Sequence, residues 1–93
     1  MLTEKDYCDY DSAEKLWELG YPDNNWIQLY EAQKWLREAK NLHIDCGYNP
    51  SLSWYYYHVW NGQEEIAEGE AFPTYEDALK TAIYMATEFL KEE

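Results

Sequence analysis

Residues 53–60 read Ser-Trp-Tyr-Tyr-Tyr-His-Val-Trp, and Asn61-Gly62 follows at once. Aromatic and β-branched residues favour strands, and Asn-Gly is the strongest short signal for a two-residue hairpin turn. The sequence therefore predicts a strand over about 53–60 and a return strand over about 64–72. Because Glu, Ala and Gly dominate the return strand, we expect it at the edge of the sheet, where its charges discourage edge pairing.

An amphipathic helix is predicted directly after this hairpin. Thr74 is followed three residues later by Asp77, which is a capping pattern, and the carboxylates of Glu76 and Asp77 suit the positive end of a helix dipole. Apolar residues then recur at helical spacing. They form one stripe that should be buried: Ala78, Leu79, Ala82, Ile83, Ala86, Phe89 and Leu90.

Two further helices are predicted in the first half of the chain. Asp11 with Glu14 resembles a capping box, so a short helix should run to about Leu19 and stop at Gly20. A second helix should run from residue 27 or 28 to Lys40. Its expected apolar stripe is Leu29, Ala32, Trp35, Leu36 and Ala39, with Lys34, Arg37 and Lys40 on a solvated flank.

A strand over residues 42–48 completes the pattern, because Leu42, Ile44 and Cys46 alternate with polar residues or glycine. Residues 1–10 are expected to form a loosely ordered segment that precedes the first helix. The whole chain of 93 residues is expected to be a single α+β domain. Its predicted order is α-α-β-β-β-α, with a three-stranded antiparallel sheet and helices on one face.

Charge and cysteine content restrict the partners and the compartment. The formal net charge is -12, which opposes direct binding to nucleic acid or to an anionic membrane and favours a basic protein partner. The N-terminus shows no export signal, and no apolar stretch is long enough to cross a bilayer. Cys8 and Cys46 have no metal or redox spacing, so we expect reduced thiols in a cytoplasmic protein, although a disulfide stays open.

The aromatic strand should place aromatic side chains on both of its faces. Trp54, Tyr56 and Trp60 alternate with Tyr55 and Tyr57. Core packing and cross-strand pairing explain such a run most simply, but one face of the sheet is left for solvent or a partner. The candidate interaction surface combines aromatic and acidic residues: Tyr55, Tyr57, Glu64, Glu65, Glu68, Glu70, Glu76 and Asp77.

No pattern in the sequence indicates catalysis, a cofactor or a metal. His43 and His58 have no nucleophile or third ligand at a suitable spacing. Cys46 alternates inward with Ile44 and reads as a small core residue. The sequence therefore predicts a non-enzymatic protein without a cofactor.

The α-β-β-β-α portion resembles the double-stranded RNA-binding domain in topology. The segment from Gly69 to Leu79 lies where that family begins its second helix and places lysines that grip phosphates. Glu76 and Asp77 stand there in this chain. The resemblance thus implies the topology and not RNA binding, since the charge at the phosphate contact is reversed.

Three segments over about residues 10–90 look like a set of small proteins carried by gut bacteria and their phages. They are Ser12–Tyr21, Tyr30–Arg37 and Phe72–Ile83. This likeness implies a fold and a mobile-element context only, and carries no functional residues.

Three functional hypotheses follow from the sequence. The leading one is a small acidic, non-enzymatic protein-interaction module of phage or mobile-element type, whose protein partner is unknown and for which the charge favours a basic one. The first alternative is a nucleic-acid-mimicking inhibitor of a nucleic-acid-binding protein, and the second is a small enzyme or ligand-binding protein with an aromatic lining. Self-association is a further option, because the Lys34, Arg37 and Lys40 flank complements the acidic edge of another copy.

Overall fold

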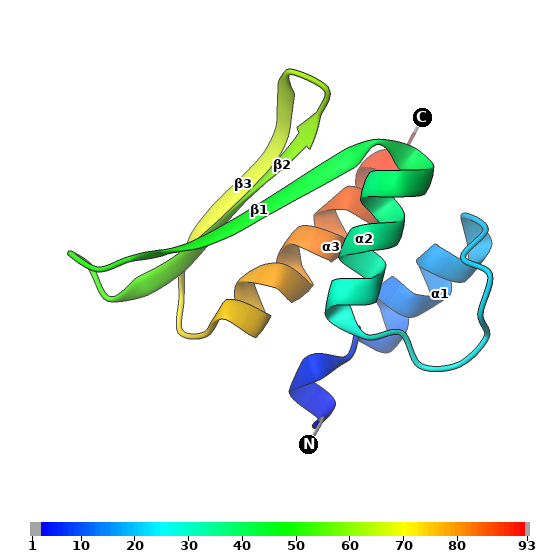
Figure 1. Ribbon diagram of the computed structural model, residues 1–93, viewed down its shortest axis with the longest axis horizontal. Coiled ribbons are helices and arrows are strands. Elements are labelled where there is room, and N and C mark those ends of the chain that lie inside the picture. Colours follow the sequence, from blue (N-terminus) through cyan, green and yellow to red (C-terminus); the bar gives the residue numbers. More distant parts are fainter. Residues whose placement is uncertain (1–2, 93) are drawn as a thin grey trace.

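The computed structural model describes residues 3–92, and its elements follow the predicted α-α-β-β-β-α order (Figure 1). A 3-10 turn, η1 (Glu4–Asp6), comes first. The other elements are α1 (Tyr10–Glu18), α2 (Leu29–Lys40), β1 (Leu42–Asn49), β2 (Trp54–Asn61), β3 (Glu64–Phe72) and α3 (Tyr75–Lys91). The predicted α+β class is confirmed.

The three strands form one antiparallel sheet in the order β1-β2-β3, so the aromatic strand is central and β3 is an edge strand. The β2–β3 hairpin closes over Gly62 and Gln63, because Asn61 still pairs with Glu64. The predicted Asn61-Gly62 turn is therefore displaced by one residue. Gly62 adopts a φ of 64°, which glycine tolerates without steric strain.

The helices build the other layer of the domain. α3 contacts all three strands, α2 contacts β1 and α3, and α1 packs on α3 (Figure 1). The predicted stripe of α3 forms much of the core, with Ala82 and Ile83 fully buried and Phe89 and Leu90 packed at its margin. The largest fully buried side chains of the domain are Leu16, Ile27, Leu36, Leu42, Val59, Ile83 and Thr87.

The apolar residues predicted to be buried on α2 are buried or half-buried, except at the end of the helix. Leu29, Ala32 and Leu36 are buried, and Trp35 is half-buried against Tyr21, with their ring centroids 5.5 Å apart. Ala39 is exposed instead. Ala39 points within about 20° of the buried Ala32, seven residues earlier, so its exposure comes from its place in the last turn of α2, where the helix ends.

A local signal fixes the C-terminal end of α1, whereas its start differs from the prediction. Gly20 (φ 107°) ends the helix as expected, with its N–H bonded to the Trp17 carbonyl and the Tyr21 N–H bonded to the Leu16 carbonyl. This is the paired hydrogen-bond pattern of a glycine-terminated helix. The N-cap, however, is Asp9 rather than Asp11, which lies inside the first turn.

The N-terminal segment is held more firmly than the sequence suggests. Met1 and Leu2 lie outside the described residues, but the Cys8 N–H donates to the Ile27 carbonyl at 2.8 Å, and Cys8 is buried in the core. A bridge between Tyr7 and Gln28 adds a second attachment. These contacts could not be predicted from the polar sequence of the segment, because they are made by backbone atoms and by one small side chain.

Between residues 3 and 92, no helix has the length and apolar character that crossing a membrane requires.

Candidate functional site

Alternation along β2 separates a covered face of the sheet from an open one. Tyr57 and Val59 are buried on the side of the helices. The other face of β2 carries half-buried side chains in a row: Trp54, Tyr56, His58 and Trp60. We call the face of the sheet that carries this row the open face.

This arrangement corrects the choice of aromatic residues for the interaction surface. Tyr57 is only 4% exposed, and burial raises the pKa of its hydroxyl. Tyr55 lies on the same, helix-facing side, where its ring packs 4.9 Å from that of Tyr48 and 6.3 Å from that of Tyr75. Neither ring belongs to the open face, because α3 covers their side of the sheet. The sequence shows the alternation but not which face the helices cover.

The rings of the row contact one another along the strand. The centroids of Tyr56 and His58 lie 5.4 Å apart, and those of His58 and Trp60 lie 6.3 Å apart. The Tyr56 ring extends over Gly47 of β1, where a Cβ atom would meet its hydroxyl oxygen at 2.3 Å. The glycine thus leaves room for a flat aromatic surface that spans two strands.

The predicted acidic residues divide between two locations. Glu65 and Glu68 approach His58 from β3, and Glu70 lines the same open face. Glu64 is exposed at the hairpin end of β3. Glu76 and Asp77 instead lie in the first turn of α3, where the Asp77 N–H is capped by the Thr74 hydroxyl at 3.1 Å.

The basic residues are confined to the helical layer. Each of the seven Lys and Arg residues lies in η1 or a helix, and the strands contain none. The strands carry five carboxylates, Asp45, Glu64, Glu65, Glu68 and Glu70. The cations pair within the helical layer, as in the contacts of Lys15 with Glu88 and Lys91 with Glu18. The sheet therefore carries acidic residues with no basic residue among them, whereas the helices and loops carry more acidic residues together with all of the basic ones.

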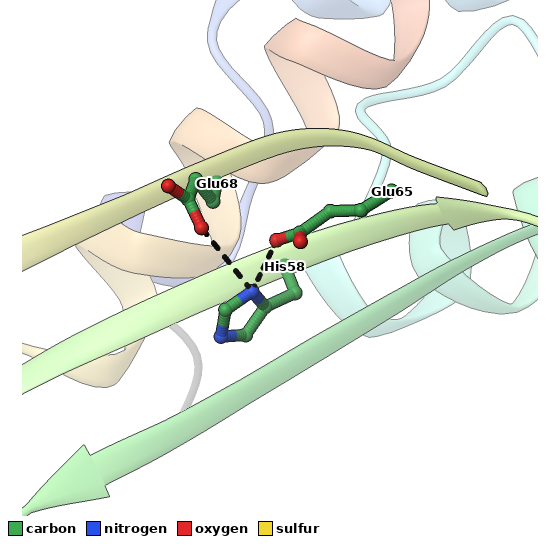
Figure 2. A group of neighbouring side chains, drawn as sticks. All are labelled: His58, Glu65 and Glu68. Atoms are coloured by element: carbon green, nitrogen blue, oxygen red, sulfur yellow. Dashed lines mark hydrogen bonds and ion pairs between the residues drawn. The ribbon is translucent and has the colours of Figure 1, made fainter. Parts of the chain in front are cut away.

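The side chains of His58, Glu65 and Glu68 lie close together on the open face. The Nδ1 atom of His58 lies 2.5 Å from a carboxylate oxygen of Glu65 and 3.9 Å from one of Glu68 (Figure 2). One ligand-type atom from each of the three residues falls within 4.8 Å of the others. The sequence spacing indicated no third ligand-type group for His58, and the fold brings two carboxylates close to it.

A β-bulge creates this convergence. Trp60 pairs with Glu65, and a regular ladder would then set His58 opposite Ala67. The register shifts between Val59 and Trp60, so that His58 pairs with Glu68 instead. Counting from the hairpin would find Glu65 near the row, but no signal in the sequence reveals the extra residue.

A hollow adjoins the cluster on the open face. It has a volume of about 460 Å³. Its walls include three carboxylates, those of Asp45, Glu68 and Glu70, together with the Trp54 and Tyr56 rings. Acidic and aromatic groups thus surround a space large enough for a cationic side chain.

A larger groove of about 1070 Å³ lies at the other side of the domain, beside the N-terminal segment. Tyr7, Tyr10, Trp17 and Trp26 contribute aromatic walls. The indole N–H of Trp17 is buried there without a hydrogen-bond partner among the described residues. The groove contains Lys80 as well as carboxylates, so its charge is mixed.

The thiols are not poised for nucleophilic chemistry. Burial, assisted by the charge of Asp9, raises the pKa of Cys8 to about 12, and burial raises the pKa of Cys46 to about 12 as well. Both cysteines are free. A thiol with so high a pKa is protonated at neutral pH and reacts slowly.

Searches of protein-family models, curated proteins and solved structures find no match to the chain.

Proposed function

We propose that the protein is a non-enzymatic interaction module that binds a basic segment of another protein on the open face of its sheet. One observation carries this proposal: a row of four ring side chains, Trp54 to Trp60, lies on the side of the domain that has carboxylates and no Lys or Arg. The module acts in the cytoplasm, in keeping with its two free thiols.

The chemistry of the open face fits arginine best. A guanidinium stacks on Trp or Tyr rings and also forms paired hydrogen bonds with a carboxylate. The hollow offers both kinds of group, with Trp54 and Tyr56 beside Glu68 and Glu70. A lysine ammonium can also lie over an aromatic ring, but it lacks the planar group that stacks on the ring and pairs with a carboxylate through two hydrogen bonds. We therefore expect a partner segment with at least one arginine.

A matched pair of double variants tests the location. Asp45→Lys with Glu70→Lys reverses two charges on the open face, and Glu14→Lys with Glu38→Lys reverses two exposed charges on the helices. Both change the net charge equally. Tagged wild-type protein should capture its partner from lysate, the helix variant should do the same, and the open-face variant should lose it. Equal loss in both variants would mean that only net charge matters, and the proposal would fail.

The same capture distinguishes this proposal from a nucleic-acid mimic, and light scattering distinguishes it from self-association. A partner that duplex DNA displaces would indicate a nucleic-acid mimic, which requires carboxylates but not the aromatic row. Self-association through the α2 flank would appear as a dimer in light scattering, and Arg37→Glu would remove it. Capture should also weaken between about 50 and 300 mM salt, because exposed charges are screened over about a Debye length.

A further inference from the structure

We propose that His58, Glu65 and Glu68 bind a divalent transition-metal ion of the Zn²⁺ type. The site lies on the open face, and no ligand spacing in the sequence indicates it. The proposal does not rest on the proposed protein partner, because the three ligands come from this chain alone (Figure 2).

The spacing of the three ligand atoms suits a small ion. Zn²⁺ binds His nitrogen and Glu oxygen at about 2.0–2.2 Å, so tetrahedral neighbours lie about 3.4 Å apart. The distances from His58 Nδ1 to the Glu65 and Glu68 oxygens, 2.5 and 3.9 Å, fall on either side of this value. Small rotations of two exposed carboxylates would therefore seat the ion without movement of the backbone.

The backbone itself brings the ligands together. Residues three apart in a regular strand point to opposite faces, so Glu65 and Glu68 would ordinarily be separated by the sheet. The bulge in β3 turns both toward His58, while Ile66 and Ala67 both pack against the core. Bulges often re-aim side chains beside functional sites. A hydrogen bond between His58 and Glu65 accounts for the position of Glu65 alone. It gives no reason for Glu68 to lie on the same face, whereas a shared ion does.

The ligand set selects the class of metal. An imidazole nitrogen favours Zn²⁺ and its transition-metal neighbours, whereas Mg²⁺ and Ca²⁺ prefer sites made of oxygen alone. Three protein ligands leave a fourth position open, as in zinc sites that hold a water molecule. The hollow beside His58 and Glu68 gives that position access to solvent.

Calorimetric titration of the reduced, chelator-treated full chain with Zn²⁺ tests the site. We expect one ion per chain, and no comparable binding of Mg²⁺. His58→Gln and Glu68→Gln should each weaken binding by at least about tenfold, because each removes one of three ligands. Two variants serve as matched controls. Glu70→Gln removes one charge from the same face, and His43→Gln removes the other histidine; each should change the affinity by less than about twofold.

Several results would overturn the proposal. Equal losses in Glu68→Gln and Glu70→Gln would show diffuse attraction to an acidic surface. Undiminished binding by a folded His58→Gln variant would exclude the imidazole, and loss in His43→Gln would move the site elsewhere. Titration with Co²⁺ checks the thiols: a thiolate-to-cobalt absorption band would assign the metal to Cys8 or Cys46 instead. If His58→Gln lowers the melting temperature, Glu65→Gln provides the second ligand test.

Discussion

The Tyr57 ring packs against Gly69 on the neighbouring strand, so closely that a Cβ atom on the glycine would meet Tyr57 Cε2 at 2.3 Å. Tyr57 is almost fully buried, and its ring also packs against Phe72 at a centroid distance of 5.7 Å. The glycine therefore allows the core aromatic side chain to lie close to the sheet. It is a packing requirement, not a turn requirement.

Gly69→Ala should destabilise the domain by about 1–3 kcal/mol, the usual range for overpacking a filled core. Gly47→Ala is the matched control. Its new methyl group would meet the hydroxyl end of Tyr56 on the open face, and that ring can move toward solvent. Chemical denaturation of both variants should show the larger loss for Gly69. A larger loss at Gly47 would contradict the assignment of the two faces.

Ala82→Asp should unfold the protein or cost more than about 3 kcal/mol, because the position is fully buried and an unpaired charge there has no partner. Met85→Asp, on the exposed side of the same helix, serves as the control. A thermal melt should show a large decrease for the first variant and a small one for the second. A near-wild-type melt for Ala82→Asp would mean that α3 buries a different face.

Thr74→Ala should cost about 1 kcal/mol, since the Thr74 hydroxyl accepts the Asp77 N–H at the start of α3. Thr74→Ser keeps the oxygen and should stay within a few tenths of a kcal/mol of wild type. The free energies of unfolding in urea measure both. Equal losses would assign the effect to the methyl group and not to the cap.

The ion pair between Lys15 and Glu88 joins α1 to α3 and should make stability depend on pH. The hydrogen bond from Lys15 lowers the pKa of Glu88 below its ordinary value of 4.5. Its contribution is therefore present above that value and is lost as the pH falls through the lowered pKa. Glu88→Gln should melt below wild type at pH 7, and the difference should vanish in acid. Glu14→Gln, which removes an exposed carboxylate from α1, should show no such trend.

The elements of the fold were predictable because their signals are local. Thr74 and Gly20 mark helix ends through contacts within a few residues, and the stripe of α3 is visible in its spacing. The start of α1 was misplaced because Asp11 imitates a cap within the first turn of a helix that begins one residue earlier. Backbone contacts such as that of Cys8 with Ile27 leave no pattern in the sequence.

The site was less predictable because it depends on how the two layers pack. Period-two alternation separates Tyr57 from Trp60 correctly, but only the position of α3 decides which of them is buried. The convergence of Glu68 on His58 depends on a bulge, which changes the pairing without a change in composition. A site that depends on the register between two strands therefore cannot be predicted from one amino-acid sequence.

The most direct test of the open face is nuclear magnetic resonance of the labelled protein during titration with a short arginine-rich peptide and a lysine-rich peptide of equal charge. We expect the largest shifts along β2 and β3, including the indole N–H groups of Trp54 and Trp60, and a stronger response to the arginine peptide. Shifts spread evenly over exposed carboxylates such as Glu14 and Glu38, with no preference between peptides, would contradict a binding surface on the open face.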